Sequence, residues 1–145
     1  MLFSSFDKGS KVWVYRSSRL LTTSEISYIN KTLVDFVSHW STHGKKLMAD
    51  SKVLLGYFVV FVVDESNVQI SGCSIDKSVH IMQSIGQTLG IDFFDRMSVL
   101  SIDNNEFSIK KFQDVRNDKN SSYFNPMISN LDQLRHHWII QNELE

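Results

Sequence analysis

The apolar run from Val53 to Val63 constrains the fold of this chain more than any other feature. It is far shorter than the roughly 20 residues that a membrane-spanning helix requires. Its valines and aromatic residues favour β-structure, and its continuous apolar character is typical of a strand covered on both faces. We therefore predict a buried, central β-strand, against which the rest of the chain packs.

A helix is predicted before this strand. Thr22 and Glu25 have the spacing of a capping box, in which a hydroxyl and a carboxylate bind the first free N–H groups of a helix. Apolar residues then recur at three- and four-residue steps from Ile26 to Trp40, which gives the helix one apolar face. Gly44 is the predicted end of this helix, because glycine readily adopts the left-handed conformation of a helix stop.

A second helix follows, since residues 75–89 repeat the same apolar spacing and Gly90 supplies a second stop signal. The residues Asp103-Asn104-Asn105 predict a hairpin turn, and Asn130 predicts the cap of a short final helix carrying Leu131, Leu134 and Trp138. The remaining strands are predicted at residues 11–15, 47–51, 96–102 and 106–110. Residues 114–122 are predicted to form a polar loop.

This order of elements predicts a single α+β domain over residues 1–145. We expect a ferredoxin-like two-layer sandwich with a βαββαβ core and a mostly antiparallel sheet, extended by a C-terminal hairpin strand and the short helix. The first and third strands are expected to be parallel neighbours. The loops 16–22 and 64–74 would then lie side by side at one sheet edge, with residues 40–44 and 92–96 at the opposite edge.

The composition excludes several classes of protein. Hydrophobic residues make up 42% of the chain, charged residues 21%, and the net charge is -1, as in an ordinary globular protein, so we expect no nucleic acid as partner. One cysteine cannot form an internal disulfide, and the N-terminus lacks the pattern of a signal peptide. We expect a cytoplasmic protein that binds neither a membrane nor a cofactor.

The candidate functional site is the polar segment between the apolar strand and the second helix. The N-terminus of a helix presents free N–H groups, glycine lets a ligand approach closely, and hydroxyls and arginines can hold an anion. We predict that this site binds a small anion or a protein segment through Arg16, Arg19, Asp64, Glu65, Ser71, Gly72, Ser74 and Asp76.

Other hypotheses remain open for the same residues. Cys73, near the start of the predicted helix, could be an enzyme's nucleophile, with Asp64 or Glu65 as its base. Ser71 or Ser74 could simply cap the helix. A third hypothesis is a structural homodimer built on a sheet edge.

Two further clusters have alternative explanations. His39 and His43 have the spacing of two zinc ligands on a helix but lack recognisable further ligands, and an interaction with the helix dipole explains them equally well. The segment Asp92-Phe93-Phe94-Asp95-Arg96 is either a plug for the end of the core, with Arg96 paired to a neighbouring aspartate, or a patch that binds a partner. We favour the plug.

The string Ser71-Gly72-Cys73-Ser74-Ile75-Asp76, together with Val12-Trp13-Val14-Tyr15, Trp40-x-x-His43-Gly44 and Asp92-Phe93-Phe94-Asp95-Arg96, resembles a family of small uncharacterised bacterial proteins. Some members of that family carry the label "ABC transporter ATPase". A phosphate-binding P-loop is absent here, because Lys46 follows Gly44-Lys45 and His39 occupies the place of the first glycine. The resemblance implies no activity, cofactor or ligand.

Overall fold

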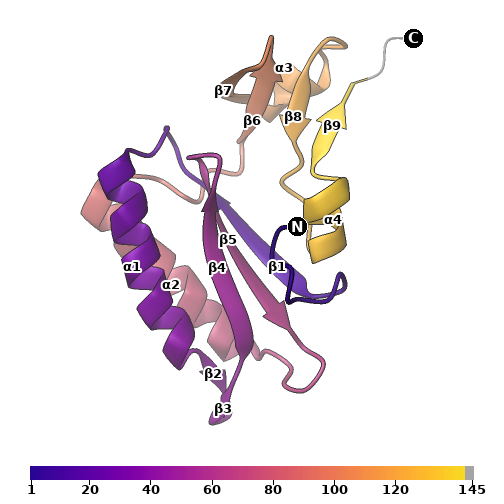
Figure 1. The fold of residues 1–145 in the computed structure, drawn as a ribbon. Helices are drawn as coiled ribbons and strands as arrows, with labels where there is room; N and C mark the ends of the chain where they lie inside the picture. The colour runs from indigo at the N-terminus through magenta and orange to yellow at the C-terminus, as the bar shows by residue number, and fades with distance from the viewer. Residues whose placement is uncertain (143–145) are drawn as a thin grey trace.

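A computed structural model describes residues 1–142 (Figure 1). The first half of the chain forms β1 (Lys11–Arg16), α1 (Thr23–His39), β2 (Ser41–Thr42), β3 (Lys45–Lys46), β4 (Met48–Leu54), β5 (Phe58–Asp64) and α2 (Gly72–Leu89). The second half forms β6 (Ser98–Asp103), β7 (Glu106–Lys111), α3 (Phe112–Arg116), β8 (Ser122–Phe124), α4 (Leu131–His136) and β9 (Ile139–Gln141). The α+β class and the mostly antiparallel pairing are confirmed.

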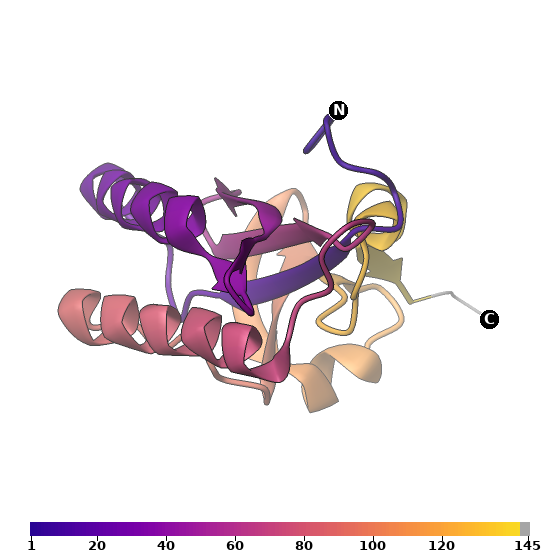
Figure 2. The ribbon, with the colours of Figure 1, turned by 90° about the horizontal axis from the view of Figure 1, so that it is seen from below.

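The predicted buried strand is β5, the central strand of a three-stranded sheet with the order β1-β5-β4. Its residues 58–63 are all buried, and α1 and α2 lie together over one face of the sheet (Figure 2). Phe61 points into the core on that side, which also contains Leu33 of α1 and Met82 of α2. The apolar run is not one strand, however, because Leu55 and Gly56 adopt positive φ and turn the chain between β4 and β5.

The expected parallel pairing of the first and third strands is wrong. β1 and β5 are neighbours, but they run antiparallel, with Lys11 opposite Val63 and Arg16 opposite Phe58. The tight hairpin between β4 and β5 reverses the chain, so that β4 is parallel to β1 and β5 opposes both. The carboxyl ends of β1 and β5 therefore lie at opposite ends of the sheet.

The strand predicted at residues 96–102 does not join this sheet. It forms β6 of a second sheet with the order β7-β6-β8-β9, which departs from the expected ferredoxin-like arrangement (Figure 1). The predicted hairpin after β6 is confirmed, with Asn104 and Asn105 at positive φ. The C-terminal part of the chain also covers the second face of the first sheet, where Phe124 and Leu131 pack in one apolar cluster with Val60.

The helix signals are mostly confirmed. Thr22 makes the capping box of α1, Asn130 caps α4, and Gly90 ends α2 in the left-handed conformation. Gly44 was wrongly assigned, because α1 already ends at His39 and Gly44 lies in the turn between β2 and β3. Residues 112–116 form α3 where the predicted loop begins, and α4 ends before Trp138. Within residues 1–142, no helix combines the length and apolar character needed to cross a membrane.

Candidate functional site

The predicted site residues lie at opposite ends of α2. Arg19 donates a hydrogen bond from Nη2 to the main-chain oxygen of Leu89 (3.1 Å), the last residue of the helix, whereas Ser71 caps its start. The 18 residues of α2 separate these ends by about 27 Å. The expected pocket between the arginine loop and the serine turn therefore does not form. It required β5 to run parallel to β1, and β5 runs antiparallel to it.

The hydroxyl groups at the start of α2 are used within the fold. Ser71 Oγ accepts a hydrogen bond from the N–H of Ser74 (3.2 Å), which confirms the capping hypothesis. Thr42 Oγ1 lies 2.6 Å from Ser74 Oγ and 3.1 Å from Ser71 Oγ. Trp40 Nε1 donates to the main-chain oxygen of Ser74 (2.9 Å). Trp40 and Thr42 were expected at the other edge, and they instead join the end of α1 to the start of α2.

The two acids after β5 organise the loop that leads to α2. Asp64 Oδ1 accepts from the N–H of Ser66 (2.8 Å), and the hydrogen bonds from Ser66 lower the pKa of Asp64. Glu65 accepts from the N–H of Ile70 through Oε2 (2.9 Å), and its Oε1 lies 3.0 Å from Lys11 Nζ. Both carboxylates thus have intramolecular partners.

Both arginines are also occupied. Arg16 donates from Nη2 to the main-chain oxygens of Asp95 (3.2 Å) and Ser98 (3.3 Å), and burial lowers the pKa of Arg16. Its ion pair with Asp95 replaces the expected pairing of that aspartate with Arg96. Arg19 binds Glu25 with both terminal nitrogens (2.8 and 2.7 Å). Neither arginine lies near the start of α2.

Three predicted residues at the start of α2, Gly72, Cys73 and Asp76, are exposed. No described residue forms a hydrogen bond with the thiol of Cys73, so the structure provides no base in contact with it. Within residues 1–142, no three histidine, cysteine or acidic side chains gather closely enough to hold a metal ion. The features of this turn that favour a reactive cysteine are thus the exposure of the thiol and its position in the first turn of α2.

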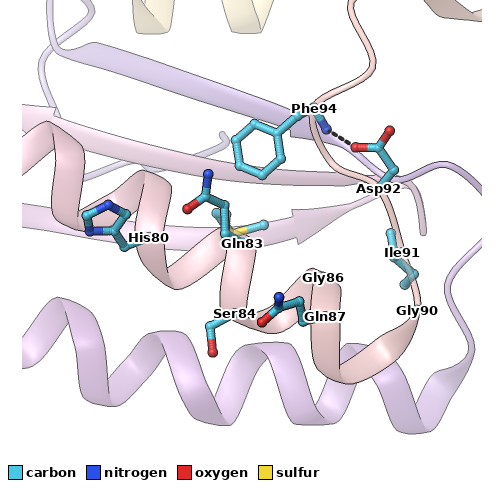
Figure 3. Close-up of a pocket in the computed structure, with 10 residues that line it drawn as sticks. His80, Gln83, Ser84, Gly86, Gln87, Gly90, Ile91, Asp92 and Phe94 are labelled. Carbon is cyan, nitrogen blue, oxygen red and sulfur yellow. Dashed lines mark hydrogen bonds between the residues drawn. The ribbon is translucent and has the colours of Figure 1, made fainter.

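A groove of about 740 Å³ lies along the other half of α2 and the segment that follows it (Figure 3). Its lining combines polar helix side chains with one aromatic ring: His80, Met82, Gln83, Ser84, Gly86, Gln87, Gly90, Ile91, Asp92 and Phe94. We did not predict this site from the sequence. One sequence feature could have indicated it. The polar residues at positions 80, 83, 84 and 87 fall on one face of a helix, shortly before the aromatic pair Phe93-Phe94.

The close approach of residues 91–94 to α2 shapes the groove. Ile91 donates from its N–H to the main-chain oxygen of Gly86 (2.9 Å), and a Cβ atom at Gly86 would lie only 2.6 Å from the oxygen of Ile91. Asp92 Oδ1 accepts from the N–H of Phe94 (2.8 Å), which holds the turn (Figure 3). The Phe94 ring packs edge-on against Tyr15 at 5.6 Å and remains 37% exposed.

The two phenylalanines of this segment differ in role. Phe93 is buried in the core beneath the helices, as the plug hypothesis predicts. Phe94 instead faces the groove. The segment lies beside the loop after β1, since Ser18 Oγ accepts from the N–H of Asp92 (3.1 Å), and not at the opposite edge as expected.

The groove has little charge. Among residues 1–142, Asp92 is the only carboxylate that lines it, and no lysine or arginine does. Its other polar groups are the amides of Gln83 and Gln87, the hydroxyl of Ser84 and the imidazole of His80, which both donate and accept hydrogen bonds. The arrangement suits a neutral ligand with both kinds of hydrogen-bonding group, and not an anion.

Comparison of the chain with known protein families, with curated proteins and with solved structures finds no match.

Proposed function

We propose that this protein is a non-enzymatic binding module and that the groove along α2 binds a short, extended segment of a partner protein. The observation that carries the proposal is the partly exposed Phe94 ring, which is held beside a row of neutral polar side chains by the turn at Asp92. An exposed aromatic ring in a fixed position is a typical anchor for a partner side chain.

The openness of the groove favours a protein segment over a small molecule. His80, Gln83, Gln87 and Asp92 are all exposed, so a small ligand would keep much of its surface in water, whereas small-molecule sites usually enclose most of the ligand. The amide groups of glutamine match the alternating N–H and C=O groups of an extended peptide. Along α2, residues 80–90 span about 15 Å, which corresponds to about four or five extended residues.

The charge of the groove indicates which charge the partner segment should have. Among the described residues of the lining, Asp92 is the only acidic or basic side chain of the Asp, Glu, Lys and Arg kind. A neutral or basic segment is therefore preferred over an acidic one, because an acidic segment would meet a carboxylate and no cation. This preference replaces the small anion that we expected at the start of α2.

Selection from a random pentapeptide library, displayed as fusions, tests this proposal. We expect enrichment of neutral or basic peptides on the wild-type protein and loss of their binding to Phe94→Ala. Gln69→Ala, which removes an exposed glutamine outside the groove, is the matched control and should bind like the wild type. Enriched peptides that bind Phe94→Ala equally well, or no enrichment at all, would refute the groove as the binding site.

Two other functions have some support. A thiol-dependent enzyme is supported by the exposure of Cys73, although no described residue provides a base in contact with the thiol. A homodimer built on a sheet edge is supported by the terminal position of β4 in the first sheet. Asp50 and Lys52 are exposed on this strand, and charged side chains on an edge oppose pairing, so we rank the homodimer third.

We also infer that β1, α1, β4, β5 and α2 keep the strand order and the helix placement of the first five elements of the expected ferredoxin-like core, with β5 antiparallel to β1 instead of parallel. The strand order β1-β5-β4 and the position of both helices on one face support this inference. In this interpretation the sixth element of the core corresponds to β6, which belongs to the second sheet instead of the first.

A further inference from the structure

A second pocket, of about 460 Å³, lies where the two sheets meet. The turn between β4 and β5 points toward the second sheet (Figure 1) and contributes Leu55. The second sheet and its connections contribute Phe107, Phe124, Trp138 and Ile139, and α4 contributes Arg135. None of these residues belongs to the groove along α2, so the two sites are separate. We call this second site the junction pocket.

The walls of the junction pocket are aromatic and tightly packed. Phe124 contacts Trp138 with ring centres 4.8 Å apart and Phe107 at 5.7 Å. Three apolar side chains remain open to solvent around these rings: Leu55 is 49% exposed, Phe107 38% and Ile139 50%. Binding of an apolar group over these exposed aliphatic and aromatic side chains is favourable, because it removes apolar surface from water.

Arg135 gives this apolar site a positive charge in a fixed position. Its Nε donates to the main-chain oxygen of Leu2 (3.0 Å), and its Nη2 donates to those of Phe3 (2.9 Å) and Phe6 (3.2 Å). Nη1 has no hydrogen-bond partner among residues 1–142, and no carboxylate in that part of the chain lies within ion-pair distance of Arg135. Among the described residues, its guanidinium group is therefore held in place by main-chain oxygens and has no acidic partner.

We propose that the junction pocket binds an amphipathic carboxylate, with its apolar part against Phe124 and Trp138 and its carboxylate at Arg135. Charge complementarity selects this occupant, because the described residues of the lining include Arg135 and no acid. Guanidinium groups bind carboxylates strongly, and more so next to apolar surface, where water competes less. The inference is independent of the peptide groove.

Trp138 provides a fluorescent reporter in the wall of the pocket. We expect saturable changes of emission when the protein is titrated with octanoate or with 3-phenylpropanoate, and the loss of these changes in Trp138→Phe. Stronger binding of octanoate than of 3-phenylpropanoate would identify an aliphatic ligand, and the reverse order an aromatic one. 1-Octanol should bind at least about fivefold more weakly than octanoate, because it lacks the charge that Arg135 attracts. Equal affinities for octanol and octanoate, or no saturable change with either carboxylate, would overturn the proposal.

A pair of variants at Ile139 tests the charge argument without removing Arg135, which holds the N-terminal segment. Ile139 is half exposed at the pocket, so Ile139→Glu and Ile139→Lys should both fold, which equal melting temperatures would verify. We expect octanoate to bind Ile139→Glu about fivefold or more weakly than Ile139→Lys, because the two differ in charge beside the ligand. Octanol should bind both variants equally. Equal octanoate affinities in the two folded variants would refute the carboxylate.

Discussion

Trp40 Nε1 donates a hydrogen bond to the main-chain oxygen of Ser74, 2.9 Å away, and both residues are buried. This bond joins the C-cap residue of α1 to the first turn of α2. It also explains why the polar turn at the start of α2 is not a pocket: its hydroxyls and one of its carbonyls bind the incoming segment 40–42.

Replacement of Ser74 by alanine is expected to destabilise the fold. The change removes one of the partners of Thr42 Oγ1, which retains Ser71, and the side-chain donor to the Ser41 oxygen; losing these two hydrogen bonds costs about 1–3 kcal/mol. Urea unfolding would measure the loss. Thr88→Ala, at an exposed position of the same helix, should change the free energy of unfolding by about 0.5 kcal/mol or less. A Ser74→Ala protein as stable as the control would contradict a structural role for this hydroxyl.

Gly86 and Gly72 form a matched pair of glycines in α2. A Cβ at Gly86 would collide with the Ile91 oxygen, so Gly86→Ala should cost about 1–3 kcal/mol and disturb the groove. A Cβ at Gly72 meets nothing within 4 Å, so Gly72→Ala should leave stability unchanged or slightly raised. Thermal unfolding of both variants checks the contrast, and similar melting temperatures would argue against the close approach of residues 91–94.

The pair formed by Arg19 and Glu25 predicts a pH dependence. The hydrogen bond from Arg19 is the main cause that lowers the pKa of Glu25 from 4.5 to about 2. A carboxylate with a lowered pKa in the folded state stabilises the fold at pH values above 4.5, and this contribution is lost as the pH falls toward 2. Glu25→Gln should therefore reduce the slope of stability against pH in this window. Urea midpoints measured from pH 5 to pH 2 provide the test, and identical slopes would show that the pair has no effect.

Cys73 should react completely with a thiol reagent in the native protein, because its side chain is exposed. Colour release from a disulfide reagent without denaturant would measure one thiol per chain. If the protein is a binding module, alkylation of Cys73 should not change peptide binding at the groove. Loss of that binding on alkylation would instead connect the thiol to function.

Much of the local structure could be predicted from the sequence. The capping box at Thr22, the stop at Gly90 and the cap at Asn130 depend on hydrogen bonds within a few residues, so their signals are local and were correct. Gly44 misled us because glycine serves a hairpin turn as well as it serves a helix end.

The candidate site could not be predicted to the same extent. The polar residues at the start of α2 were identified as a cluster, but their partners Trp40 and Thr42 come from a distant segment. The groove was missed because it depends on residues 91–94 folding back onto Gly86. The type of a single residue does not predict such a contact.

By itself, the sequence determined most of the longer helices and strands, the starts of α1 and α4, the end of α2, and that β5 is buried, because these properties follow from short-range bonds and from the pattern of apolar residues. Only the tertiary structure decided that β5 runs opposite to β1, that Arg19 and Ser74 lie at opposite ends of α2, and that β6 builds a second sheet. The physical reason is that strand direction depends on pairing between distant segments, which local preferences leave open.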